Sequence, residues 1–153
     1  MSEGSERKYL DRNRYVPHFV ALIANVFTSG SSREYLARYG VGLNEARIVS
    51  VLGHVPGLTP TQLGTAMGMN KSIVSRSLAA MVGQGLVAQT GSPRALKTVL
   101  TPAGLALHDH VVVMALRREE RLLEGFGDDE RAVLLDFLMR MLRNTETMRF
   151  PNQ

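Results

Sequence analysis

The chain has 153 residues, 44% hydrophobic and 21% charged, which is typical of a soluble globular domain, alone or with a long helical appendage. It has no cysteine, which excludes disulfides, cysteine-based zinc sites and thiol redox sensing. The net charge is +4, no apolar run approaches the roughly 20 residues of a membrane span, and the polar N-terminus lacks a signal core, so a cytoplasmic protein is expected.

Basic side chains are unevenly distributed along the chain. Residues 1–58 carry 7 basic and 5 acidic groups, residues 59–101 carry 4 and 0, and residues 102–153 carry 7 and 9. A stretch with four positive charges and no negative ones suits a polyanion such as nucleic acid.

The first third of the chain predicts a flexible tail followed by two helices. Residues 1–14 are polar. Apolar residues then recur every three or four positions, which predicts one helix over about 16–39; the alternative is a break at the small residues 28–32. Asn44 is an expected N-cap for a second helix over about 45–54, which Pro56-Gly57 ends. The apolar stripe of the first helix consists of Val16, Phe19, Val20, Ile23, Val26 and Phe27.

The stretch 59–101 predicts two short helices and a hairpin. Thr59, Pro60 and Gln62 form a capping-box pattern for a helix that Gly68 ends. Asn70 then caps a second helix, closed by the glycines at 83 and 85. Strands are expected at 86–90 and 95–100, around a turn at 91–93. The predicted buried stripe of the second helix is Ile73, Val74, Leu78, Met81 and Val82.

Two long helices follow. Thr101 and Pro102 start the first, over about 102–124, and Asp128 is the expected cap of the second, which runs to about 147. The fold class is therefore mainly α with a small β-hairpin (α+β), arranged as a winged helix-turn-helix. We expect a tail at 1–14, a DNA-binding lobe at 43–101, and a helical dimerisation region at 15–40 and 102–148.

The helix after Asn70 is the candidate for reading DNA. Its outward positions are Lys71, Ser72, Ser75, Arg76, Ala79 and Ala80. Arg76 can bond guanine with two hydrogen bonds, the serines can bond bases or phosphates, and Lys71 suits phosphate. In the hairpin, Arg94 at the tip can enter a minor groove and Lys97 can touch the backbone. The alternative is a solvated helix face and a surface hairpin with ordinary solubilising charges.

Other polar residues give weaker signals. His108 and His110 lie two apart on a helix and therefore point to different faces, so no metal site is expected. His18, Arg47 and His54 lie on the first two helices, where a pocket can form, although such residues are more often surface groups. No phosphate loop, Ser-His-Asp arrangement or carboxylate pair stands out, so neither an enzyme nor a cofactor is expected.

The long outer helices carry more apolar surface than so small a winged lobe can cover. A two-fold dimer covers the surplus. A dimer also suits DNA recognition, because paired recognition helices one DNA turn apart read a near-palindromic operator.

The segments NKSIVSRSLAAMVGQGLV (70–87) and LTPAG (100–104) resemble the MarR family, the multiple-antibiotic-resistance type of bacterial transcription regulator, over about residues 16–147. The resemblance implies a dimer built from the N- and C-terminal helices, a recognition helix at 70–83 and a wing at 86–101. It also implies that Asn70, Lys71, Ser72, Ser75 and Arg76 face the groove and that Arg94 is the wing arginine. Ser92 stands where the family usually has Asp, and the wing is about three residues shorter.

Family members often bind small aromatic or phenolic compounds between the dimer helices and the DNA-binding lobe, which weakens DNA binding. By analogy the pocket is expected near the patch 30–32, with candidates His18, Ser31, Tyr35, Tyr39 and Arg47. The resulting hypothesis is a dimeric, ligand-released repressor that binds double-stranded DNA. The alternative from another class is a winged-helix protein-interaction module without DNA binding.

Overall fold

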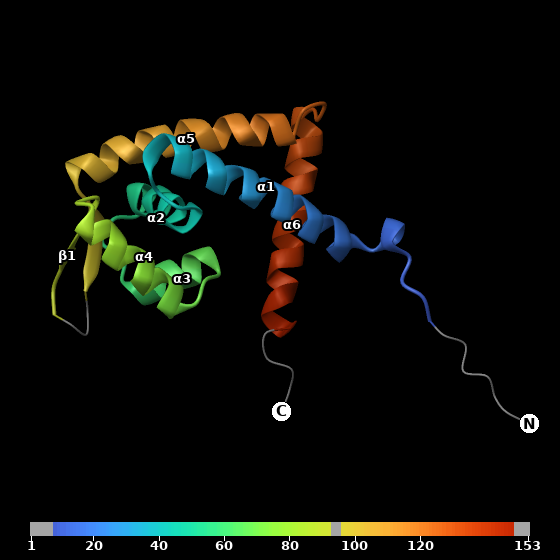
Figure 1. The fold of residues 1–153 in the computed structure, drawn as a ribbon. Coiled ribbons are helices and arrows are strands. Elements are labelled where there is room, and N and C mark those ends of the chain that lie inside the picture. The colour runs from blue at the N-terminus through green and yellow to red at the C-terminus, as the bar shows by residue number, and fades with distance from the viewer. Residues whose placement is uncertain (1–7, 93–95, 149–153) are drawn as a thin grey trace, which may run out of the picture. The chain divides into compact units, whose positions relative to one another are not determined.

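The computed structural model describes residues 8–92 and 96–148, and it contains six α-helices and one two-stranded hairpin within them (Figure 1). The predicted fold class, mainly helical with a small hairpin in a winged helix-turn-helix order, is confirmed. The chain divides into two compact units, Met1–Val111 and Val112–Gln153. The elements are η1 (Arg12–Arg14), α1 (Val16–Tyr39), α2 (Leu43–His54), α3 (Pro60–Met67), α4 (Lys71–Gly83), β1 (Val87–Thr90), β2 (Lys97–Leu100), α5 (Pro102–Leu122) and α6 (Asp128–Met148).

Helix α1 is continuous, so the alternative of a break at residues 28–32 is wrong. The hydroxyls of this patch bond back to the preceding turn: Thr28 Oγ1 donates to Ala24 O at 2.7 Å and Ser31 Oγ donates to Phe27 O at 2.8 Å. These bonds satisfy side chains that otherwise favour non-helical conformations. Before α1, the predicted tail includes the short 3-10 helix η1, whose N-cap is Asp11.

Helix α2 lies at the centre of the first unit, where it packs against α1, α3, α4 and β2. Its residues Ala46, Ile48, Val49 and Leu52 are buried. The prediction that Asn44 caps this helix is wrong. Ala46 N–H donates to Gly42 O at 3.0 Å, so the helix starts two residues earlier and Asn44 lies inside its first turn. The N-cap is Gly42, and no side chain caps the helix.

The junction between α3 and α4 follows the predicted signals. Thr59 and Gln62 form the capping box, with Thr59 N–H donating to Gln62 Oε1 at 2.9 Å. Gly68 ends α3 in the left-handed conformation (φ 64°), which glycine adopts without steric penalty. Met69 N–H then donates to Gly64 O at 2.8 Å and closes a Schellman-type turn. Only residues 68–70 link α3 to α4.

The hairpin is antiparallel, with register Val87↔Leu100 through Thr90↔Lys97, and both strands begin later than predicted. On the other edge of β2, Thr98 bonds the segment before α3: its N–H donates to Leu58 O at 3.0 Å, and its carbonyl accepts from Gly57 N–H at 2.9 Å. The wing is thus attached to the α2–α3 link along its second strand.

Thr101 caps α5 as predicted, since its Oγ1 accepts from Gly104 N–H at 3.1 Å. The same hydroxyl donates to Gly85 O at 2.6 Å, which joins the start of α5 to the segment that follows α4. Helix α5 ends at Leu122, two residues earlier than expected.

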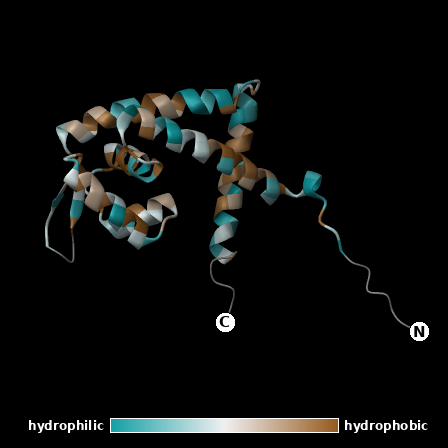
Figure 2. Cartoon of the chain, in the orientation of Figure 1, coloured by the Kyte–Doolittle hydropathy of each residue, from teal (hydrophilic) through white to brown (hydrophobic). Residues whose placement is uncertain are grey.

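In the second unit, α6 begins at Asp128, and Arg131 N–H donates to Gly127 O at 3.0 Å. Asp128 is therefore inside the first turn, so the prediction that it caps the helix is wrong. No described residue of α6 is buried. Apolar residues occur along both α1 and α6 (Figure 2), and Ile23 and Phe137, on these two helices, are 50% and 52% exposed. None of the described helices is long and apolar enough to cross a bilayer.

Candidate nucleic-acid interface

The outer face of α4 presents a short row of polar and basic side chains. Lys71, Ser72, Ser75 and Arg76 are exposed, as predicted from the sequence, and so are both alanines of the next turn. Val74, Leu78 and Met81 are buried on the opposite face. The burial pattern differs from the prediction at three positions, because Ile73 is only half-buried, Val82 is 45% exposed and the polar Ser77 is buried.

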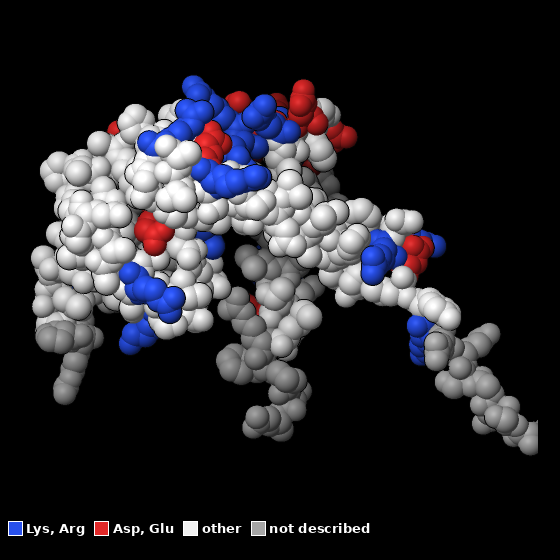
Figure 3. Space-filling model, in the orientation of Figure 1, with Lys and Arg blue, Asp and Glu red and all other residues white. Residues whose placement is uncertain are grey.

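Lys71 and Ser75, and likewise Ser72 and Arg76, are separated by four residues, so each pair lies on one side of the helix. The four side chains therefore form one continuous surface over the first two turns of α4. That is the part of a recognition helix that reaches base edges in known complexes. Within the described residues, none of Lys71, Arg76 and Lys97 makes an ion pair. With no acidic residue between positions 59 and 101, this face keeps its full positive charge. Figure 3 shows basic atoms at the lower edge of the lobe that holds α3 and α4.

Asn70 caps α4 as predicted from the sequence, and it also accepts a hydrogen bond from Ser72, which was not predicted. Its Oδ1 accepts from Ile73 N–H at 3.1 Å, which caps α4, and also from Ser72 Oγ at 2.7 Å. The carbonyl of this amide is thus occupied, and only its NH₂ group remains available to DNA. The hydroxyl hydrogen of Ser72 is likewise used, so Ser72 presents lone pairs to the outside.

The wing residues are only partly described. Lys97 is the first residue of β2 and is exposed. Arg94, expected at the tip, lies outside the described residues. Its contact with a minor groove therefore stays a prediction.

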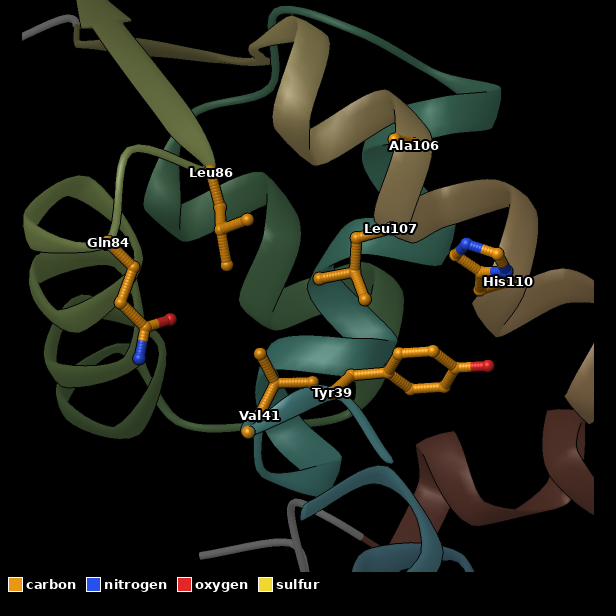
Figure 4. A pocket seen from close by; sticks show the side chains of 8 residues that line it. Tyr39, Val41, Gln84, Leu86, Ala106, Leu107 and His110 are labelled. Atoms are coloured by element: carbon orange, nitrogen blue, oxygen red, sulfur yellow. The ribbon is translucent and has the colours of Figure 1, made fainter. Parts of the chain in front are cut away.

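One candidate ligand residue, Tyr39, lines an open pocket of about 420 Å³ in the first unit (Figure 4). Its ring stacks on that of His110, with centroids 5.4 Å apart and planes at 18°. Sequence reasoning missed His110 as a pocket residue, because it lies 71 positions from Tyr39 and no local pattern links the two. The other lining residues are Gly40, Val41, Gln84, Leu86, Ala106 and Leu107.

The remaining ligand candidates do not gather around this pocket within one chain. Ser31 and Tyr35 are buried in α1, and the Arg47 guanidinium bonds the carbonyl of Met67 at 2.7 Å. His18 lies 21 positions before Tyr39 on the same helix, a distance of roughly 30 Å along its axis.

The two histidines of α5 point to different neighbours, as expected. His108 lies against Gly53, where any added Cβ would collide with its ring, and His110 stacks on Tyr39. No group of three His, Cys, Asp or Glu side chains in the described part of the chain is arranged to hold a metal ion.

Comparison with known proteins gives one family. A sequence model described as MarR family matches residues 39–95. A search of curated proteins gave no significant match. Among solved structures, a MarR/EmrR family transcriptional regulator from Acinetobacter sp. ADP1 has a TM-score of 0.81 and 27% identity, with 91% of this chain and 99% of that chain covered.

Two further structures extend the comparison. A MarR family transcriptional regulator from Silicibacter pomeroyi has a TM-score of 0.80 and 25% identity, over 90% of this chain and 96% of the other. MepR of S. aureus, in a structure described as a DNA complex, has a TM-score of 0.76 at 15% identity, over 88% of this chain and 99% of the other. At 15% identity the likeness to MepR concerns the fold alone.

The double hydrogen bonding of Asn70 leads to a stability prediction. We expect Asn70→Ala to lower the free energy of unfolding by about 1 kcal/mol, because the N–H of Ile73 loses its acceptor. Asn70→Asp keeps an acceptor oxygen at the cap and should stay within a few tenths of a kcal/mol of the wild type. Urea unfolding measures both variants, and equal stability of Asn70→Ala and wild type would show that the cap contributes nothing.

Proposed function

The chain belongs to the MarR family of winged helix-turn-helix transcriptional regulators, and we propose that it binds double-stranded DNA sequence-specifically in the cytoplasm and represses transcription. The observation that carries the proposal is the exposed, acid-free face of α4, which keeps Lys71 and Arg76 unpaired among the described residues. The fold shared with MepR, whose structure is described as a DNA complex, supports DNA binding by this fold. We propose no catalytic role.

Each polar residue of this face has a proposed task. Arg76 reads a guanine through two hydrogen bonds in the major groove, and Ser75 adds a bond to a base or phosphate. Lys71, at the first position of α4, neutralises a phosphate beside the positive end of the helix dipole. Lys97 in β2 and Arg94 in the wing contact the backbone and the minor groove. Ser72 accepts hydrogen bonds from exocyclic amines of bases, because its own hydrogen is held by Asn70.

The substitution Arg76→Ala tests the base-reading role. It should lose roughly 1–3 kcal/mol of discrimination at one base position of a duplex selected by the wild-type protein. Competition binding against single-base variants of that duplex measures this loss. Lys71→Ala is the matched control. It should weaken binding to all duplexes equally and reduce the slope of log affinity against log salt concentration (the salt slope) by about 0.9.

Two outcomes would contradict this account. If Arg76→Ala kept the wild-type ratio between selected and scrambled duplexes, Arg76 would not read a base. If the wild-type protein showed no salt-sensitive retention on DNA-cellulose, the chain would instead be a winged-helix protein-interaction module.

We propose that two copies associate through α1 and the helices of residues 102–148. The apolar stripe of α1 is exposed in the single chain, as is that of α6, and Val16, Phe19, Val26, Leu138 and Leu142 are each at least 45% exposed. Apolar faces of this extent on separate helices favour burial in an interface. A two-fold dimer would pair two α4 helices for a near-palindromic operator.

The substitution Ile23→Glu tests the dimer, because it places a charge in the middle of the α1 stripe. We expect the wild type to sediment as two chains at micromolar concentration and Ile23→Glu to sediment as one, since a buried unpaired carboxylate costs several kcal/mol. Asn25→Glu lies on the opposite side of α1 and should remain dimeric. Dissociation of both variants, or of neither, would argue against an interface at this stripe.

We further propose that a small aromatic or phenolic effector releases the protein from DNA by binding at Tyr39. The pocket volume, about 420 Å³, falls within the range of small-molecule sites, and its walls combine aliphatic side chains with the Tyr39–His110 stack. Tyr35, Ser31 and His18 lie on the same helix but do not line this pocket within one chain.

A panel of substituted benzoic acids and phenols, screened for release of the selected duplex, tests the effector proposal. We expect the active compounds to need at least tenfold higher concentration with Tyr39→Ala, because the stacking surface is lost. Tyr9→Ala, at a tyrosine that is 86% exposed, serves as the control. The proposal is wrong if no compound releases DNA, or if both variants respond as the wild type does.

A further inference from the structure

The guanidinium of Arg47 makes a contact that ties two helices together. Arg47 lies on α2, and its Nη2 donates to the carbonyl oxygen of Met67, the last residue of α3, at 2.7 Å. The two residues are 20 positions apart in the sequence. The distance is short for a hydrogen bond of this type, which is characteristic of a charge-assisted bond.

The carbonyl of Met67 needs such a partner because of the turn that follows it. In that turn Gly68 N–H bonds Thr65 O and Met69 N–H bonds Gly64 O, so the carbonyls of Gly64 and Thr65 are satisfied. Met67 O receives no backbone hydrogen bond from any described residue. It also lies at the negative end of the α3 dipole, where a cation is favoured. The Arg47 guanidinium supplies both a donor and a positive charge.

The anchor at the other end of the contact is rigid. Arg47 is flanked on α2 by Ala46 and Ile48, which are 1% and 0% exposed, so its backbone is fixed in the core. From Met67 only residues 68–70 remain before α4, and Asn70 is already the cap of that helix. A fixed Met67 carbonyl therefore fixes where α4 starts and in which direction it leaves the turn.

We propose that Arg47 is a positioning residue for DNA binding: it holds the α3–α4 turn against α2, and thereby sets the approach of α4, without itself touching DNA. The inference rests on the proposed DNA-binding function and assigns Arg47 to the turn rather than to an effector pocket. The competing account is a direct contact of Arg47 with a phosphate. The two accounts differ in salt dependence, because only a residue that neutralises a phosphate releases a counterion.

The test compares Arg47→Met and Arg47→Lys with the wild type on a duplex that the wild type selects from random sequence. Methionine keeps much of the aliphatic stem but has no donor, so we expect roughly tenfold weaker specific binding with an unchanged salt slope. The lysine ammonium can still donate to Met67 O and should keep affinity within about threefold. Lys71→Ala, with its expected slope change of about 0.9, shows that the assay detects a phosphate contact.

Three results would overturn the proposal. A salt slope reduced by about one in Arg47→Met would make Arg47 a phosphate contact. Unchanged affinity in Arg47→Met would make the contact irrelevant to DNA binding. A loss in Arg47→Lys as large as that in Arg47→Met would exclude the hydrogen bond as the cause.

Hydrogen exchange without DNA separates failure of this inference from failure of the proposed function. In Arg47→Met the amides of Met69 and Ile73, both hydrogen-bonded at the turn, should exchange faster than in the wild type, while amides of the α2 core should not. Uniform acceleration, or none, contradicts the positioning role even if the wild type selects no duplex. If Arg47→Met does not fold, the same exchange and binding measurements on Arg47→Lys decide: near-wild-type values support the proposal, and a tenfold loss overturns it.

Discussion

The three-residue link between α3 and α4 is the constraint on which the rest of the proposed DNA surface depends. Gly68 turns the chain in a left-handed conformation, Met69 N–H closes back on Gly64, and Asn70 immediately caps α4. An added Cβ at Gly64 would lie 2.8 Å from the Met69 carbonyl oxygen, so the turn packs tightly onto α3. With so little chain between the helices, the direction of α4 follows from how this turn is held.

Hydrogen bonds elsewhere in the first unit fix the chain before α3 and after α4. Thr98 bonds the hairpin to the segment before α3, and the Thr101 hydroxyl bonds the start of α5 to Gly85 after α4. Behind them the core residues of α2 are almost fully buried, so the junctions rest on a rigid helix. Apolar packing therefore supplies the support, and a few directed hydrogen bonds set the geometry at which α4 faces outward.

The sequence predicted those features that depend on neighbours close along the chain. Thr59, Asn70 and Thr101 act as caps because a cap bonds within three residues of itself. The prediction for Asn44 was wrong although it too relied on local sequence. Asparagine is a favoured cap residue, but α2 starts after Gly42 and has no side-chain cap. The bond from Arg47 to Met67 and the stack of Tyr39 on His110 join distant positions, and their geometry depends on tertiary packing that no local pattern encodes.

The first turns of α6 and α4 differ in charge, and the difference affects the local stability of α4. The first turn of α6 holds Asp128, Asp129 and Glu130, which stabilise the positive end of a helix dipole. The first turn of α4 has no acidic residue and begins with Lys71. It therefore lacks the roughly 0.3–1 kcal/mol of stabilisation that each negative charge gives at a helix N-terminus. Asn70 offsets part of this cost with a neutral cap. Helices α1, α3 and α5 also start without an acidic residue, so the feature that distinguishes α4 is the cation Lys71 at its first position. A lysine beside the positive end of a helix dipole is expected where an external anion binds, and DNA phosphate is the anion that the proposed function provides.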